Sequence, residues 1–189
     1  MYLKCISEET VMRQHMIGQT LLDMMQEQPY DKIRVGEICE KANVSRRLFY
    51  RYFGCKDGAL SALIDNAIME HIQYTIDEGI DLSDVDSSMV SIFQYWKKQS
   101  PLLDVLYING LDGIYLERAL YYGVNEDTYL RRCLEYGGMP CDTEAIIFAI
   151  NGLTSIVLNW HHGGFQKTPQ EMGMLLKRLL CVPLLTPFK

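Results

Sequence analysis

The sequence predicts an all-α protein, and three observations lead to this fold class. Apolar residues recur at intervals of three and four along most of the chain, which is the spacing of one helix face. We find no convincing alternation of apolar and polar residues of the kind that is typical of a half-buried strand. Helix signals such as Thr168-Pro169 at a start and Gly163-Gly164 at an end separate the apolar segments.

The size and composition limit the class of protein. A chain of 189 residues can form one compact unit, or a small domain joined to a larger one. No apolar run approaches the roughly 20 residues of a membrane-spanning helix, so we expect a cytoplasmic protein without a membrane partner. The six cysteines are scattered without a Cys-x-x-Cys pair, and we expect reduced thiols, no metal and no cofactor.

Three helices are expected in the N-terminal part. The first covers about residues 8–28 and the second about 35–42. Asn43 follows at a chain reversal, where asparagine tolerates the left-handed conformation better than other residues with a side chain. Ser45 is the expected N-cap of the third helix, because its hydroxyl can accept a hydrogen bond from an amide two or three positions later.

The third helix separates anchoring residues from displayed ones. Phe49 and Phe53 lie four positions apart and should pack inward, whereas the other face carries arginines and Tyr50. Residues 31–60 contain seven cations and four anions, a local net charge of +3 in a chain whose net charge is −6. A short helix, a tight turn and a basic helix form a helix-turn-helix that fits the DNA major groove. The alternative is a solvated charged face, but the surrounding spacing favours DNA binding.

Residues 33–60, IRVGEICEKANVSRRLFYRYFGCKDGAL, resemble the TetR family of bacterial transcription regulators. The resemblance implies a three-helix DNA-binding domain and a larger helical domain for ligand binding and dimerisation, which we assign to residues 1–55 and 56–189. Val35 departs from the family pattern, in which a hydroxyl residue often caps the second helix. Arg47 and Leu48 depart as well, so the base sequence that is read cannot be transferred. The residues implied to contact DNA are Ser45, Arg46, Arg47, Tyr50, Arg51, Tyr52 and Lys56, with Lys56 clamping a phosphate.

The larger domain should consist of further helices. A long connecting helix is expected over residues 56–78, followed by an acidic loop at 81–88. Thr168 and Glu171 form a capping box that opens the last helix. The remaining expected helices cover residues 89–99, 101–109, 113–136, 142–162 and 169–181.

Aromatic residues of the larger domain are candidates for an effector pocket. Aromatic rings with a polar group suit an amphipathic ligand, although at each position a role in the core is the more common one. The adjacent His161 and His162 point about 100° apart on a helix, which argues against a metal site. The pocket candidates are Phe93, Trp96, Tyr107, Tyr115, Tyr122, Phe148 and Trp160.

The last two expected helices are candidates for a homodimer interface. A helix that is apolar over most of its circumference must be covered on several sides, either by its own subunit or by a second copy. In the family such helices pair with their copies, and a twofold dimer reads two DNA half-sites about 34–36 Å apart. The interface candidates are Ile146, Ala149, Ile150, Gly152, Leu153, Val157, Leu175 and Leu179.

The resemblance implies a function in transcription regulation. We expect a homodimer on a near-palindromic double-stranded DNA operator, acting as a repressor that a small-molecule effector releases. The alternative is an activator that needs a co-regulator protein, because residues 100–113 and 159–172 resemble the branch of dihydroxyacetone-kinase operon regulators, some of which activate. An enzyme is not expected, since the sequence contains no P-loop, no Gly-x-Ser-x-Gly elbow and no His-Glu-x-x-His.

Overall fold

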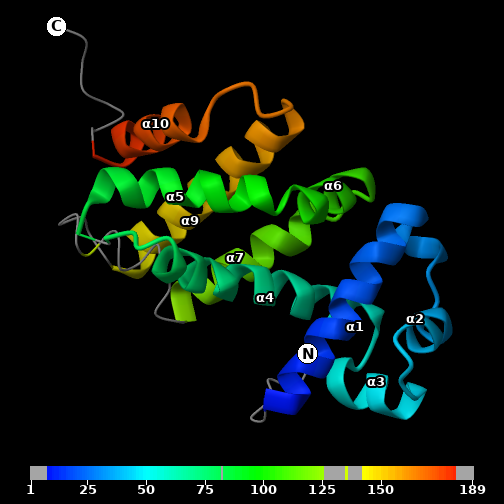
Figure 1. Cartoon of the computed structure of the whole chain (residues 1–189). Helices are drawn as coiled ribbons and strands as arrows, with labels where there is room; N and C mark the ends of the chain where they lie inside the picture. The colour runs from blue at the N-terminus through cyan, green and yellow to red at the C-terminus, as the bar shows by residue number, and fades with distance from the viewer. Residues whose placement is uncertain (1–7, 82, 126–134, 136–141, 182–189) are drawn as a thin grey trace, which may run out of the picture. The chain divides into compact units, whose positions relative to one another are not determined.

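A computed structural model describes residues 8–81, 83–125, 135 and 142–181, and every regular element in these ranges is helical (Figure 1). The predicted all-α fold class is therefore confirmed. The elements are α1 (Glu8–Glu27), the 3-10 helix η1 (Tyr30–Lys32), α2 (Val35–Lys41), α3 (Arg46–Phe53), α4 (Lys56–Asp77), α5 (Val85–Lys98), α6 (Ser100–Ile108), α7 (Asp112–Asn125), α9 (Thr143–His162) and α10 (Pro169–Cys181).

The described residues pack as two compact units. The first unit draws on Met1–Ala67 and Pro101–Arg118, and the second on Ile68–Ser100 and Ala119–Lys189. This division lies inside α4, whereas the predicted functional boundary lies between residues 55 and 56 and stays a prediction. The first part of α4 belongs with the N-terminal helices because Leu63 packs beside Gly18 of α1.

Local signals set the boundaries of the first three helices as predicted. Asn43 adopts the left-handed conformation with φ 51° between α2 and α3. The Ser45 Oγ accepts a hydrogen bond of 3.2 Å from the Leu48 amide and caps α3. Gly54, with φ 72°, ends α3 in a conformation that costs a residue with a side chain more than it costs glycine. The predicted helix-turn-helix is thus present in the first unit.

The acidic segment before α5 differs from its prediction. A loop was expected over residues 81–88, but α5 begins at Val85. Asp84 caps this helix by accepting hydrogen bonds from the Asp86 amide at 3.1 Å and the Ser87 hydroxyl at 2.6 Å. Aspartate and serine favour turns and helix N-termini for the same reason, namely their short hydrogen-bonding side chains. The helix expected over 113–136 begins at Asp112, and most of its second half lies outside the described residues.

The second unit is built on the packing of α10 against α5, which lie side by side in Figure 1. A Cβ atom at Gly173 of α10 would lie 2.6 Å from the Val90 Cγ2 and 2.9 Å from the Val90 Cα, so the two backbones approach closely. The predicted capping box of α10 is present, because the Glu171 carboxylate accepts from the Thr168 amide at 2.7 Å and the Thr168 Oγ1 accepts from the Glu171 amide at 3.2 Å.

α9 corrects the expectation that no apolar segment could span a membrane. It has 20 residues and contains an 18-residue window with a mean hydropathy of 1.2, which meets the requirement for a membrane-spanning helix by length and composition only. Asp142 caps it by accepting a 2.9 Å hydrogen bond from the Ala145 amide. Its inner face, including Ile146 and Val157, is buried within the second unit.

Candidate functional site

The inner face of α3 is a rigid aromatic anchor. Phe49 and Phe53 are completely buried, with ring centroids 5.1 Å apart. Tyr50 meets the Phe49 ring edge to face at 5.8 Å, while half of its surface stays exposed. The anchor therefore holds α3 in place and supports a phenol that points outward, as the sequence predicted.

The outer face of α3 displays unneutralised cations. Arg46, Arg47 and Arg51 are exposed, and the eight residues of α3 contain no acidic side chain. Among the residues that the structure describes, none of these arginines forms an ion pair, whereas Lys41 of α2 is held by Glu27 at 2.6 Å. Guanidinium groups that face solvent and form no ion pair can bind phosphate or guanine without first breaking a salt bridge.

Tyr52 does not belong to this face. Only 4% of its surface is exposed, its ring packs edge to face on Phe53 at 6.1 Å, and the Arg51 guanidinium lies 5.3 Å from the ring centroid. The assignment of Tyr52 as a DNA contact is therefore corrected to a packing role. Tyr50 and Tyr52 are two positions apart and project in different directions on a helix, so only one of them can face outward.

Lys56 is engaged within the first unit. Its Nζ donates hydrogen bonds to the Tyr30 carbonyl at 2.7 Å and the Ile33 carbonyl at 3.0 Å, and it lies 4.0 Å from the centroid of the Tyr30 ring. Two of the three ammonium donors thus tie the start of α4 to the connection between α1 and α2. These contacts form a clasp that favours an internal role for Lys56, and its predicted phosphate contact stays a prediction.

Tyr30 completes this clasp, in a role that no sequence pattern predicted. Its hydroxyl donates to the Asp57 Oδ1 at 2.6 Å, and its amide donates to the Asn109 Oδ1 at 2.7 Å. Burial, followed by the hydrogen bond to Asp57, raises the pKa of Tyr30 above its usual range, so the phenol stays protonated. No short-range pattern links Tyr30 to Asn109, because they lie far apart in the chain.

The predicted pocket aromatics do not gather around one cavity. Phe93, Trp96 and Tyr122 are buried in the second unit, and Phe93 packs on Trp160 with centroids 5.4 Å apart. Tyr115 is buried in the first unit, and the exposed Tyr107 also belongs there. Exposed Phe148 lies on α9. Most of these rings therefore serve the core, as aromatic residues at helical spacing commonly do.

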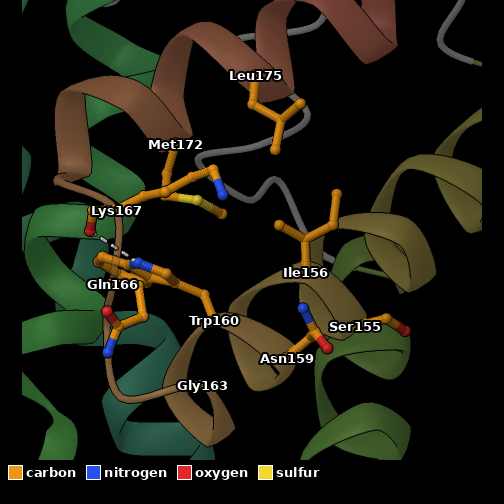
Figure 2. Close-up of a pocket in the computed structure, with 9 residues that line it drawn as sticks. All are labelled: Ser155, Ile156, Asn159, Trp160, Gly163, Gln166, Lys167, Met172 and Leu175. Atoms are coloured by element: carbon orange, nitrogen blue, oxygen red, sulfur yellow. Dashed lines mark hydrogen bonds between the residues drawn. The ribbon is translucent and has the colours of Figure 1, made fainter.

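A cavity of about 430 Å³ lies between the end of α9, the 163–168 connection and the start of α10 (Figure 2). Ile156 of α9 and Leu175 of α10 point toward one another across it. The Trp160 Nε1 donates a 2.9 Å hydrogen bond to the Lys167 carbonyl, which fixes the indole at one wall. The lining residues are Ser155, Ile156, Asn159, Trp160, Gly163, Gln166, Lys167, Met172 and Leu175.

The chemistry of this cavity suits a small amphipathic molecule. Ile156, Met172 and Leu175 provide apolar surface, and the exposed amide groups of Asn159 and Gln166 provide hydrogen-bond donors and acceptors. Lys167 supplies a cation, and the lining contains no carboxylate. Of the seven predicted pocket aromatics, only Trp160 lines the cavity.

The predicted dimer residues fall into two groups. The first is buried inside the second unit, which favours a role in the core of one copy over the predicted interface: Ile146, Ala149, Ile150 and Val157. The second is exposed or half-buried on α9 and α10: Gly152, Leu153, Leu175 and Leu179. Phe148, a predicted pocket residue, and Met174, which no sequence pattern singled out, are both 63% exposed on these helices.

Residues 19–63, which contain α2, α3 and the start of α4, match the family described as "Bacterial regulatory proteins, tetR family". Residues 19–63 therefore form a TetR-family DNA-binding domain, in which α2 and α3 are the helix-turn-helix.

One similar curated protein is the HTH-type dhaKLM operon transcriptional activator DhaS of Lactococcus lactis subsp. lactis (strain IL1403). It is 31% identical over 65 residues, which cover 34% of this chain and 35% of DhaS. The aligned stretch thus spans about a third of that relative. A solved structure titled "Dihydroxyacetone kinase operon activator DhaS" has a TM-score of 0.59 at 17% identity, covering 89% of this chain and 94% of that one. The second similarity shows a shared fold.

Proposed function

We propose that this TetR-family regulator binds a near-palindromic operator as a homodimer, with Ser45, Arg46, Arg47, Tyr50 and Arg51 at the DNA. The observation that carries the proposal is the outer face of α3, where three exposed arginines lie without a carboxylate partner among the described residues. The anchor formed by Phe49 and Phe53 presents them as one surface. Tyr52 and Lys56 stabilise the first unit in this proposal.

The first test identifies the operator. The purified protein selects fragments of its source genome at about 0.15 M salt, a concentration at which binding to phosphates alone is weakened. Enrichment of one inverted repeat supports the proposal, and recovery of DNA without a shared sequence contradicts it as stated for the protein alone.

Arg46→Ala tests the site on the selected repeat. We expect a loss of roughly 1–3 kcal/mol of binding free energy if the guanidinium contacts a base, with the fold retained because the side chain is exposed. Lys97→Ala is the matched control, since it removes an exposed cation from α5 in the second unit. Equal affinities of both variants and the parent protein in a mobility-shift titration would remove Arg46 from the site.

The first candidate mode of regulation is repression: the protein blocks transcription until a small-molecule effector binds and releases it from the operator. The cavity beside Trp160 supports this candidate, because its apolar walls and polar rim suit a small amphipathic molecule. A ligand can shift DNA affinity only if it binds the DNA-competent and DNA-free states differently. Trp96→Phe leaves Trp160 as the single tryptophan of the chain, so fluorescence can report ligands at this cavity directly.

The second candidate is activation with a co-regulator protein. Both similar proteins carry the word activator in their names, which favours this candidate. A small-molecule ligand should produce saturable thermal stabilisation of the isolated protein, whereas a purely protein-dependent regulator should show none. A reporter gene placed behind the selected operator decides the sign, since deletion of the regulator raises expression under repression and lowers it under activation.

A further inference from the structure

Gly36, the second residue of α2, lies directly beneath the side chain of Arg46 from α3. A Cβ atom at Gly36 would be 2.5 Å from the Arg46 Nη2, 3.3 Å from Cζ and 3.5 Å from Nε. Three consecutive atoms of the guanidinium edge therefore lie against the α2 backbone. Real Cβ atoms do not tolerate a contact of 2.5 Å, so this arrangement exists only because residue 36 has no side chain.

A second observation places Arg46 along the same face of α2. Cys39 lies three residues after Gly36, which is the next position on that helix face. Burial raises the pKa of the Cys39 thiol, and the positive charge of Arg46 acts in the opposite direction. The distances at Gly36 place the guanidinium on this face of α2, and its charge acts on the thiol of the next position along that face.

The backbone of α2 gives no separate reason for a glycine at this position. The glycines with positive φ among the described residues are Gly54, Gly79, Gly110 and Gly164. Gly36 lies inside a helix, where glycine is less favourable than alanine by roughly 0.5–1 kcal/mol. Its presence therefore lowers local stability, and the space that it leaves is occupied by Arg46.

We propose that Gly36 is a positioning residue for operator recognition, which holds the Arg46 guanidinium against α2 in the orientation that meets the DNA. This inference rests on the proposed function, in which Arg46 is a DNA contact. An arginine side chain has many rotamers, and confining it before binding reduces the entropy that binding must otherwise remove. Because a bidentate contact with guanine depends on the direction of the planar group, its orientation also affects which base is preferred.

The test uses Gly36→Ala, Arg46→Ala and the double variant in the full-length protein, with the operator fragment as the probe. Gly36→Ala should raise the midpoint of thermal unfolding, because alanine favours the helix and the flexible Arg46 tip can move away. The same substitution should weaken operator binding roughly five- to tenfold and relax the base preference at the pair that Arg46 reads. A purely structural role would not raise stability and lower affinity together.

The double variant and a matched control separate the explanations. In the Arg46→Ala background, Gly36→Ala should change affinity no further, because the two residues act through one contact. Gly113→Ala is the control, since it also replaces a helical glycine, has no atom within 4 Å of its added Cβ and lies in α7. It should leave operator affinity unchanged.

Three results would overturn the inference. If Gly36→Ala binds the operator within twofold of the parent while Arg46→Ala weakens binding, the proposed function stands and the positioning role fails. If Gly36→Ala weakens binding equally with and without Arg46, or lowers the unfolding midpoint, the glycine acts by another route. If Arg46→Ala itself has no effect, the DNA contact fails and the positioning role fails with it.

Discussion

At the scale of single residues, the groups that a side chain contacts within the protein determine whether it is available to bind DNA. Lys56 and Arg46 are both cations near the recognition helix, and the family resemblance assigned both to DNA. Lys56 donates to the Tyr30 and Ile33 carbonyls, whereas Arg46 forms no ion pair among the described residues and lies exposed. Residue type alone does not separate these two roles.

The clasp at Lys56 gives a prediction at this scale. Lys56→Met keeps the apolar stem but removes the ammonium donor from the Tyr30 and Ile33 carbonyls, of which the Tyr30 carbonyl still accepts a 3.1 Å hydrogen bond from the Ile33 amide. Hydrogen bonds that involve a charged group contribute about 1.5–3 kcal/mol, so we expect a loss of stability on the order of 2 kcal/mol in urea denaturation. Lys32→Met is the matched control, because Lys32 is an exposed neighbour.

Operator binding provides the second readout for Lys56. With the variant kept folded, the slope of binding affinity against salt concentration should stay unchanged if the ammonium binds only carbonyls. A slope that falls by about one ion in Lys56→Met would show that the ammonium contacts a phosphate and would contradict the internal role.

At the scale of elements, the second half of α4 packs its aromatic face against α5. His71 of α4 is buried, with its ring 4.7 Å from the Tyr95 ring of α5 and 6.4 Å from the Tyr74 ring. Lys98 of α5 lies 4.3 Å from the Tyr74 ring and forms a 3.0 Å ion pair with Glu78. The stacked rings, more than the exposed ion pair, account for the stability of this contact.

The buried histidine makes this contact sensitive to acid. Burial lowers the pKa of His71 from 6.5 to about 3, so the folded state favours the neutral imidazole. The contribution to stability is complete above pH 6.5 and is lost as the pH falls from 6.5 toward 3. Between pH 7 and 5 we expect the free energy of unfolding to fall by on the order of 2 kcal/mol through this group.

Two variants check the acid sensitivity. His71→Phe keeps an aromatic ring without a titratable group, so its stability should change less between pH 7 and 5 than that of the parent. His162→Phe replaces an exposed histidine and should keep the dependence of the parent. Parallel urea titrations at both pH values measure the difference, and identical slopes for parent and His71→Phe would show that another group is responsible.

At the scale of the whole molecule, the proposed dimer depends on surfaces that one copy leaves uncovered. Phe148, Gly152 and Leu153 of α9 and Leu179 of α10 line a cavity of about 220 Å³ in the second unit. A 63% exposed phenylalanine at this cavity is an unfavourable surface in a monomer and a favourable one when covered. We therefore assign the proposed interface to this face of α9 and α10.

Phe148→Asp tests the interface. A charge on the proposed contact surface should convert a dimer to a monomer, because an unpaired carboxylate is costly to bury. The molar mass by light scattering should fall to half, and operator affinity should fall because one copy reads only one half-site. Ile108→Asp is the matched control, since Ile108 is 78% exposed on α6 of the first unit and should leave the mass unchanged. A monomeric parent protein would contradict the proposed dimer.

Local sequence by itself determined the fold class, most helix boundaries and the helix-turn-helix. The left-handed turn at Asn43, the cap at Ser45 and the capping box at Thr168 all depend on interactions within a few residues, so sequence patterns predict them. Amphipathic spacing likewise predicted that Phe49 packs inward and that Tyr50 faces solvent.

Tertiary structure decided which candidate side chains remain available for function. Tyr52 is buried, and Lys56 donates a hydrogen bond to the Tyr30 carbonyl, which lies on another segment. Val157 is buried within its own unit. The proposed role of Gly36 depends on the position of the Arg46 guanidinium beside it, which comes from a different helix. Burial and hydrogen-bond partners depend on contacts between distant parts of the chain, and the periodicity of one helix specifies which face is apolar without specifying what covers it.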